Sequence, residues 1–377
     1  MLLRQDKFDL KVFLAEYWQK LPLLIRQPWD VWTNPLEPEE LAGLACEEEV
    51  ESRLVTGVYP ELKVEDGPFA EERFGGLGRE PWTLLVQAVD HQVPSVAALL
   101  ESFRFIPNWR VDDVMVSYAT DEGGVGPHFD QYDVFLIQGL GKRRWRVGAE
   151  CDSATELLPH EDLRLLERFQ PTSEHVLEPG DILYLPPGIA HEGIAAGHDC
   201  MTYSVGFRAP SRGELVEGWS RHLLSGLEEN DRYADPDLDA QENPGEISSA
   251  AIARLHSMAT EKLLDRDAFA RWFGRQSTAP KYPHVDWSPE QPIGPEELRD
   301  RFAAGAQLRR NPASRFCFIR TGSNSVTLFV DGYSFDCAGE AAHFAKQLCA
   351  QDLVSPGQSE MTLIETLVNR GSIAFED

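Results

Sequence analysis

Long apolar runs are absent from this sequence. No stretch approaches the roughly 20 consecutive apolar residues that span a membrane, and the first nine residues have no apolar core of a secretory signal. We therefore expect a cytoplasmic protein that neither crosses nor binds a membrane.

Basic residues are scarce relative to acidic ones. The chain has 35 lysines and arginines against 62 aspartates and glutamates, a formal net charge of −27. Because contacts to phosphate need a cationic surface, direct binding of DNA or RNA is disfavoured. Long-range steering would instead favour a basic partner, although the same charge can simply keep a protein soluble.

Cysteine pairs are also missing. No Cys-x-x-Cys occurs, which argues against a zinc ribbon or a thioredoxin-like redox pair. In a chain of 377 residues, isolated cysteines are typical of reduced thiols in a cytosolic protein. A chain of this length predicts two or three domains, and its hydrophobic fraction of 42% suffices for a buried core.

The middle of the chain is rich in predicted strands. Short apolar runs alternate with turns that contain glycine and proline, a pattern typical of a double-sheet jelly roll or cupin barrel. The predicted strands are residues 113–119, 133–138, 143–147, 174–177, 181–185 and 199–207.

The flanking segments predict an α+β fold class with further domains. Before the barrel, we expect a helix over residues 8–19, a strand over 21–25 and a helix over 82–100 that is interrupted near Pro94. The predicted domains are 1–210 (the barrel with its N-terminal elements), 211–276 (a helical segment), 277–295 (a proline-rich linker) and 296–377 (a winged-helix-like unit).

One triplet, His128-Phe129-Asp130, follows a predicted strand and a glycine-rich turn. In an extended strand, residues i and i+2 point to the same side, so His128 and Asp130 can reach one metal ion. His191 follows a Pro-Pro-Gly turn in the same predicted barrel. Two imidazoles and one carboxylate form the facial triad that holds non-haem Fe(II) with open coordination positions, although Mn(II), Co(II) and Ni(II) accept the same ligands.

The same spacing occurs by chance, and the chain contains an internal control. His284-Val285-Asp286 also reads His-x-Asp, but it lies among prolines in the predicted linker. We interpret it as a solvated turn. For His191 the alternative is a histidine satisfied by hydrogen bonds at a strand end.

A ferrous triad needs a two-electron donor to activate O₂, and a dicarboxylic keto acid would need a buried cation for its far carboxylate. Strand alternation places Arg143 with Trp145 and Val147 on one face. We therefore predict that Arg143 points inward and binds the carboxylate through its guanidinium. Lys142, Arg144 and Arg146 fall on the other face, and we expect all three to be solvated. A solvated stripe of all four cations is the alternative.

Two hydroxyl groups are further candidates for binding the keto acid. Ser204 shares a face of the last barrel strand with Thr202 and Gly206, so it could line the pocket. Tyr118, one strand before the triad, could do likewise, although a core tyrosine with a satisfied hydroxyl is the simpler interpretation.

Four segments together resemble the JmjC-type 2-oxoglutarate oxygenases called ribosomal oxygenases, and their bacterial arginine hydroxylases in particular. The resemblance covers nearly the whole chain. The segments are residues 126–139 (GPHFDQYDVFLIQG), 143–148 (RRWRVG), 178–193 (EPGDILYLPPGIAHEG) and 203–210 (YSVGFRAP).

The resemblance implies a double-stranded β-helix with Fe(II) on His128, Asp130 and His191. It also implies 2-oxoglutarate on Arg143, with Ser204 as a second contact, and O₂ as the oxidant. The helical segment after Pro210 would mediate a homodimer, and the winged helix would complete the substrate-facing surface. The substrate would be a basic large-subunit ribosomal protein, hydroxylated at an arginine β-carbon. Residues 121 and 122, both acidic, are candidates for holding that arginine.

Three other interpretations stay open at the level of sequence. The same fold could oxidise another protein residue or a modified RNA base, which the negative charge disfavours. A catalytically silent JmjC-like scaffold could bind a ribosomal protein, but an intact triad with Arg143 argues against it. A metal cupin that works without a keto acid would have no use for an inward Arg143.

Overall fold

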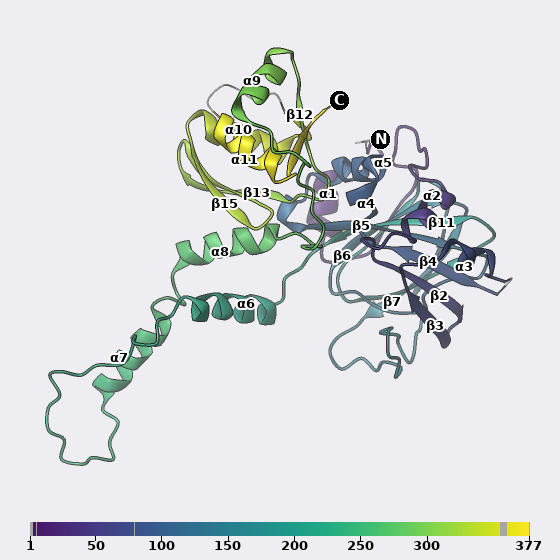
Figure 1. Cartoon of the computed structure of the whole chain (residues 1–377). Coiled ribbons are helices and arrows are strands. Elements are labelled where there is room, and N and C mark those ends of the chain that lie inside the picture. Colours follow the sequence, from purple (N-terminus) through teal and green to yellow (C-terminus); the bar gives the residue numbers. More distant parts are fainter. Residues whose placement is uncertain (1–2, 5, 79, 355–359, 377) are drawn as a thin grey trace. The chain divides into compact units, whose positions relative to one another are not determined.

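The computed structural model describes residues 3–4, 6–78, 80–354 and 360–376. The chain divides into two compact units. The first consists of Met1–Ala209 with Asn311–Ala313, and the second of Pro210–Arg310 with Ser314–Asp377. Figure 1 shows the strands of the first unit in purple to teal, and the helices and hairpin of the second in green to yellow.

Two antiparallel sheets form the first unit, which confirms the expected jelly-roll barrel. In the larger sheet the strands lie in the order β1-β9-β6-β11-β5-β4-β2-β3, and in the smaller one in the order β10-β7-β8. The larger sheet consists of β1 Leu23–Ile25, β2 Ser52–Val58, β3 Glu61–Asp66, β4 Trp82–Val86, β5 Val111–Ala119, β6 Asp133–Leu140, β9 Ile182–Leu185 and β11 Cys200–Phe207. The smaller sheet consists of β7 Arg143–Glu150, β8 Ser173–Leu177 and β10 Ile189–Ala195.

Both faces of the larger sheet are buried along β6. Val134 and Leu136 pack into a cluster with Trp145 of the smaller sheet, inside the barrel. Phe135 and Ile137 point the other way, into the main core that the N-terminal helices cover. A strand buried on both faces has a nearly continuous apolar sequence, which explains why β6 is recognisable from its residues alone.

The N-terminal region differs from prediction. Residues 82–100 do not form one interrupted helix, because Trp82–Val86 is the strand β4, which pairs with β2 and β5. A short apolar run has no periodicity that separates strand from helix, and here pairing with two neighbours decides for the strand. The remaining helices are short: α1 Leu10–Val12, the π-turn η1 Phe13–Tyr17, α2 Pro38–Leu44, α3 Glu71–Gly75, α4 Val89–Gln92, α5 Pro94–Ala97, and the 3₁₀ turns η2 Ala98–Phe103 and η3 Asn108–Arg110.

Phe135 lies at the centre of an aromatic cluster and is fully buried. Its ring centroid is 4.7 Å from that of Phe103 and 4.9 Å from that of Tyr184. Phe135→Ala would leave a cavity in this cluster, so we expect unfolding in denaturant to show a loss of about 3–5 kcal/mol. Val176→Ala, at an exposed strand position, is the matched control. A loss below about 1 kcal/mol for Phe135→Ala would show that this cluster does not support the barrel.

The second unit begins with helices and ends with a small mixed fold. Its first helix, α6 Arg212–Ser225, starts at a capping box in which Ser211 and Glu214 satisfy each other's backbone N–H groups. The other helices are α7 Ser249–Thr260, α8 Arg266–Thr278, α9 Pro295–Ala303, α10 Glu340–Ala350 and α11 Met361–Asn369. The strands are β12 Leu308–Arg310, β13 Phe316–Gly322, β14 Ser325–Val330, β15 Tyr333–Ala338, β16 Leu353–Val354 and β17 Ile373–Phe375.

Two details of the second unit were not predicted. Helix α8 runs on to Thr278 and buries Ser277 and Thr278, so the proline-rich stretch begins later than expected. The short strands β12 and β16 join β17 in a three-stranded sheet. No helix among the described residues is long and apolar enough to cross a membrane.

Candidate metal centre and cosubstrate pocket

Backbone pairing brings the two predicted histidines together. His128 precedes β6, and His191 lies in β10 of the smaller sheet. The N–H of His128 donates to the carbonyl of His191 at 3.0 Å, and the N–H of His191 donates back at 2.8 Å. This antiparallel bridge fixes both backbones, and the imidazole centroids lie 4.3 Å apart.

The side chains of His128, Asp130 and His191 converge. One possible ligand atom from each lies within 4.8 Å of the others, and Asp130 Oδ2 is 3.6 Å from His191 Nε2. Within the described ranges, this is the one such group of three histidine, cysteine or acidic side chains. The sequence prediction therefore selected residues that the fold places side by side.

Besides the backbone bridge, a side-chain hydrogen bond orients each of the two imidazole rings. Nδ1 of His128 lies 2.9 Å from the carbonyl oxygen of Gly126, and Nδ1 of His191 lies 2.9 Å from that of Ile189. Because a carbonyl only accepts, each Nδ1 must carry the proton, which leaves the lone pair of Nε2 free for a metal. Such tautomer control is typical of histidine ligands.

Electrostatics also favour the ligand form of His191. The pKa of His191 is lowered to about 4, first by burial and then by nearby His128, while Asp130 opposes the shift. The imidazole is therefore neutral near pH 7, as metal binding requires. Two neutral imidazoles and a carboxylate fit Fe(II) or another divalent metal of similar preference, so the residues present suit the ion that the sequence predicted.

His284 and Asp286 behave differently from the triad. Asp286 is exposed and accepts a hydrogen bond from the backbone N–H of Ser288 at 2.9 Å, which lowers the pKa of its carboxyl. The second His-x-Asp is therefore the local turn that the sequence analysis expected.

Arg143 points into the barrel, as strand alternation predicted. Only 4% of it is exposed, and Trp145 and Val147 on the same face of β7 are buried as well. Its Nε donates to Cys200 Sγ at 3.3 Å, but no described residue offers its buried Nη2 a hydrogen-bond partner. A buried N–H without a partner is rare and costly, so this donor fits a carboxylate bound inside the barrel.

Trp145 lies between Arg143 and the triad. Its ring centroid is 5.7 Å from the Arg143 guanidinium carbon and 5.9 Å from the centroid of His191. Its buried Nε1 also has no hydrogen-bond partner among the described residues. The interior faces of β7 and β10 around Arg143, Trp145 and His191, here called the chamber, thus carry two unsatisfied donors, and a polar dicarboxylate would satisfy them.

The other cations of this segment do not form one solvated stripe. Lys142 is exposed and pairs with Glu178 at 2.6 Å, as expected of a surface lysine. Arg146 instead pairs with Glu192, a carboxylate that is only 4% exposed. The expectation of a solvated Arg146 is therefore wrong, because β10 places a buried acid directly across from it.

Ser204 and Tyr118 lie on opposite faces of the larger sheet. Ser204 of β11 pairs with Leu136, so its side chain faces the barrel interior and stays a candidate for the keto acid. Tyr118 pairs with Met201, packs against the main core and donates to Asp199 Oδ1 at 2.8 Å. Tyr118 is partly buried and lies on the face of the sheet opposite to Ser204, which favours the simpler interpretation of a tyrosine packed against the core.

A polar network beside Arg143 was missed by sequence reasoning. Gln138 Nε2 donates to Cys200 Sγ at 3.5 Å, and Thr202 Oγ1 donates to Gln138 Oε1 at 3.2 Å. All three side chains are buried. The network orients the guanidinium, and only the pairing of β11 with β6 brings its members together.

The two acidic candidates for substrate binding, Asp121 and Glu122, differ in their contacts. Asp121 Oδ1 accepts the N–H of Gly197 at 2.6 Å, which gives it a role in the loop. Glu122 remains exposed, with Arg144 as a distant partner at 3.9 Å.

Three family models match the chain. A JmjC domain matches residues 98–215, a ROXA-like winged helix matches 259–367, and an AraC-like ligand binding domain matches 172–263. The ribosomal protein uL16 3-hydroxylase of Escherichia coli is 42% identical over 298 residues, 79% of each chain. This chain belongs to the ribosomal oxygenase family.

Other members agree with that placement. A probable ribosomal oxygenase of Haemophilus influenzae is 37% identical over 70% of this chain and 66% of its own. The crystal structure of E. coli YcfD superposes on this ribosomal oxygenase with a TM-score of 0.89 at 36% identity, over the full length of both chains. A YcfD structure in complex with cobalt and 2-oxoglutarate gives a TM-score of 0.86 at 35% identity, over 100% of this chain and 99% of that one.

Proposed function

We propose that this protein is an Fe(II)- and 2-oxoglutarate-dependent hydroxylase that acts on an arginine β-carbon of a large-subunit ribosomal protein. The observation that carries the proposal is the arrangement of the chamber. A converging His-Asp-His group lies at one end, and a buried arginine with an unsatisfied N–H belongs to the same interior face. Support for the substrate comes from the named activity of the uL16 3-hydroxylase that resembles this chain.

Each residue of the chamber has a defined task in this proposal. His128, Asp130 and His191 would hold the metal, which when bound supplies the oxidising chemistry that couples O₂ and 2-oxoglutarate to hydroxylation. Arg143 binds the far carboxylate of 2-oxoglutarate by charge-assisted hydrogen bonds. Ser204 lines the same chamber from β11.

The apolar walls exclude water. Leu136, Trp145 and Leu183 are nearly fully buried between the two sheets. A dry chamber strengthens the attraction between Arg143 and a carboxylate, and it protects reactive species from solvent.

The second unit would serve assembly and substrate docking. Helices α6 and α7 expose large apolar side chains, which supports residues 211–276 as a dimerisation segment of a homodimer. These side chains include Val216, Leu224, Ile252, Leu255 and Met258. Residues 296–377 would form the winged-helix-like domain beyond a linker that starts after the end of α8 at Thr278. A ribosomal protein substrate also supports a cytoplasmic location.

Mass spectrometry of a reacted substrate tests the proposal. Aerobic incubation of the protein with Fe(II), 2-oxoglutarate and a uL16 fragment should add one oxygen to an arginine, with succinate formed in equal amount. Oxidation of another residue type would show that the fold is right and the substrate wrong. Absence of 2-oxoglutarate turnover under all conditions would favour a silent binding scaffold.

A further inference from the structure

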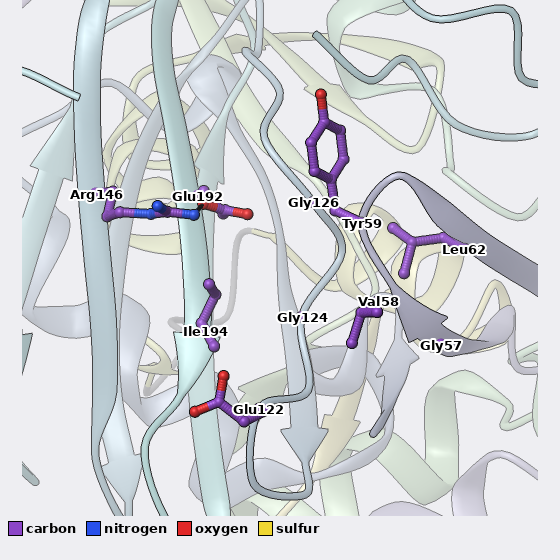
Figure 2. Close-up of a pocket in the computed structure, with 10 residues that line it drawn as sticks. All are labelled: Gly57, Val58, Tyr59, Leu62, Glu122, Gly124, Gly126, Arg146, Glu192 and Ile194. Atoms are coloured by element: carbon purple, nitrogen blue, oxygen red, sulfur yellow. Dashed lines mark hydrogen bonds and ion pairs between the residues drawn. The ribbon is translucent and has the colours of Figure 1, made fainter. Parts of the chain in front are cut away.

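A cavity of about 170 Å³ lies on the outer side of the smaller sheet. Figure 2 shows its walls: β10 and β7 on one side, the turn after β2 on the other, and the segment through Gly124 and Gly126 between them. Val58, Leu62 and Ile194 contribute apolar surface, while Glu122, Glu192 and Arg146 contribute charge.

The cavity is separate from the metal chamber. Glu192 follows His191 in β10, and successive side chains of a strand point to opposite faces. Pairing shows the same division, since His191 lies opposite Val147 of the barrel interior and Glu192 lies opposite Arg146. Only the thickness of one sheet separates the two sites.

Carboxylates outnumber guanidinium groups among the residues that line this cavity. The buried carboxylate of Glu192 pairs with Arg146, whose side chain is 34% exposed. In Figure 2, one carboxylate oxygen of Glu192 points to Arg146 and the other points away from it, toward the segment at Gly126. Glu122, with Arg144 as a distant partner at 3.9 Å, adds a second carboxylate at the rim, so the lining residues include two acids and one guanidinium.

Glu122 adopts a strained backbone conformation at the rim of the cavity. Its φ of 62° lies in the left-handed region, which residues other than glycine, asparagine and aspartate rarely adopt. Its N–H donates to the carbonyl of Ala195 at 3.1 Å, which anchors the turn to the end of β10. Strain of this kind persists where the surrounding structure enforces it and often marks functional positions.

We propose that this cavity binds a lysine or arginine side chain of the protein substrate, at a position other than the oxidised residue. The inference rests on the proposed function. Apolar walls of Val58, Leu62 and Ile194 suit an aliphatic stem, and the carboxylates of Glu122 and Glu192 suit the charged head. Because His191 and Glu192 face opposite sides of β10, the oxidised residue and this cation enter different chambers.

Binding measured without turnover tests the inference. A fluorescently labelled uL16 fragment is titrated with the full-length protein, and then with its Glu122→Lys and Glu48→Lys variants. Both glutamates are exposed, so both variants should fold, and they carry the same change of charge. We expect Glu122→Lys to raise Kd about tenfold, equivalent to about 1.4 kcal/mol, and Glu48→Lys to change it less than about twofold.

A series of fragments with single lysines and arginines changed to glutamine then locates the partner. At one lysine or arginine other than the oxidised arginine, the change to glutamine should weaken binding to the unmodified protein. The same change should add little to the effect of Glu122→Lys. Equal Kd values for the Glu122→Lys and Glu48→Lys variants, or additive effects at every position, would overturn the cavity assignment.

Mass spectra of the same fragments separate the two proposals. If an arginine is oxidised but no fragment substitution shows a non-additive effect with Glu122→Lys (coupling to Glu122), the cavity inference fails and the hydroxylase stands. Coupling to Glu122 without an oxidised arginine means that the cavity binds a cation and the proposed function fails. Absence of any binding by the unmodified protein would overturn both.

Discussion

Asp130→Ala should abolish both succinate formation and hydroxylated product. Asp130 is the only anionic member of the converging group, and its loss leaves two neutral imidazoles without the charge that balances a divalent ion. Loss of a residue that only hydrogen-bonds to a metal ligand already lowers metal affinity or activity by about 10–100-fold. Loss of a ligand itself should therefore reduce turnover on the order of a thousandfold or more. Coupled product analysis by mass spectrometry measures this directly.

Asp286→Ala is the matched control, since it makes the same change in the other His-x-Asp of the chain. Asp286 is exposed in a local turn, so its variant should keep full turnover. Thermal unfolding without metal should be similar for both variants, because the Asp130 side chain is partly exposed and fills no core position. Retained turnover in Asp130→Ala at saturating Fe(II) would remove this aspartate from the ligand set.

Arg143→Ala should raise the concentration of 2-oxoglutarate needed for half-maximal turnover by about a hundredfold. Hydrogen bonds to a charged group contribute about 1.5–3 kcal/mol each, and every 1.4 kcal/mol is a factor of ten. The requirement for Fe(II) should change far less, since Arg143 is not among the converging ligands. Steady-state titrations of each component separate the two effects.

Arg144→Ala is the control for Arg143, because it removes the same charge one residue away, from the half-exposed face of β7. Arg143→Lys should recover part of the affinity, as an ammonium retains the charge but loses the planar pair of donors. Equal increases in the Fe(II) and 2-oxoglutarate requirements would mean that Arg143 supports the fold of the barrel instead of binding the cosubstrate.

The position of the triad could be predicted because its signal is local. His128 and Asp130 are two residues apart next to a strand, and the Pro-Pro-Gly turn before His191 marks the start of another. Arg143 was predictable for a similar reason, since alternation with Trp145 and Val147 fixes its face. The function came from the resemblance to ribosomal oxygenases, because spacing alone leaves both metal and substrate open.

Features that depend on pairing between distant segments were not predictable. Arg146 was assigned to solvent because nothing in residues 142–147 shows that Glu192 lies opposite it. Tyr118 was included among the cosubstrate residues because the sequence does not show which face of the sheet it lies on. That face is set by the register between β5 and β11. The network of Gln138, Cys200 and Thr202 depends on the pairing of β11 with β6. The strand β4 becomes recognisable only once β2 and β5 are its neighbours.

Anaerobic titration with Fe(II) and 2-oxoglutarate tests the central claim most directly. Chelation of ferrous iron by a keto acid gives a weak visible charge-transfer band, and no turnover or protein substrate is needed to see it. The band should appear at one equivalent of metal in the unmodified protein and in Asp286→Ala, and it should be absent from Asp130→Ala. A band of full intensity in Asp130→Ala would contradict the assignment of His128, Asp130 and His191 as one ferrous site.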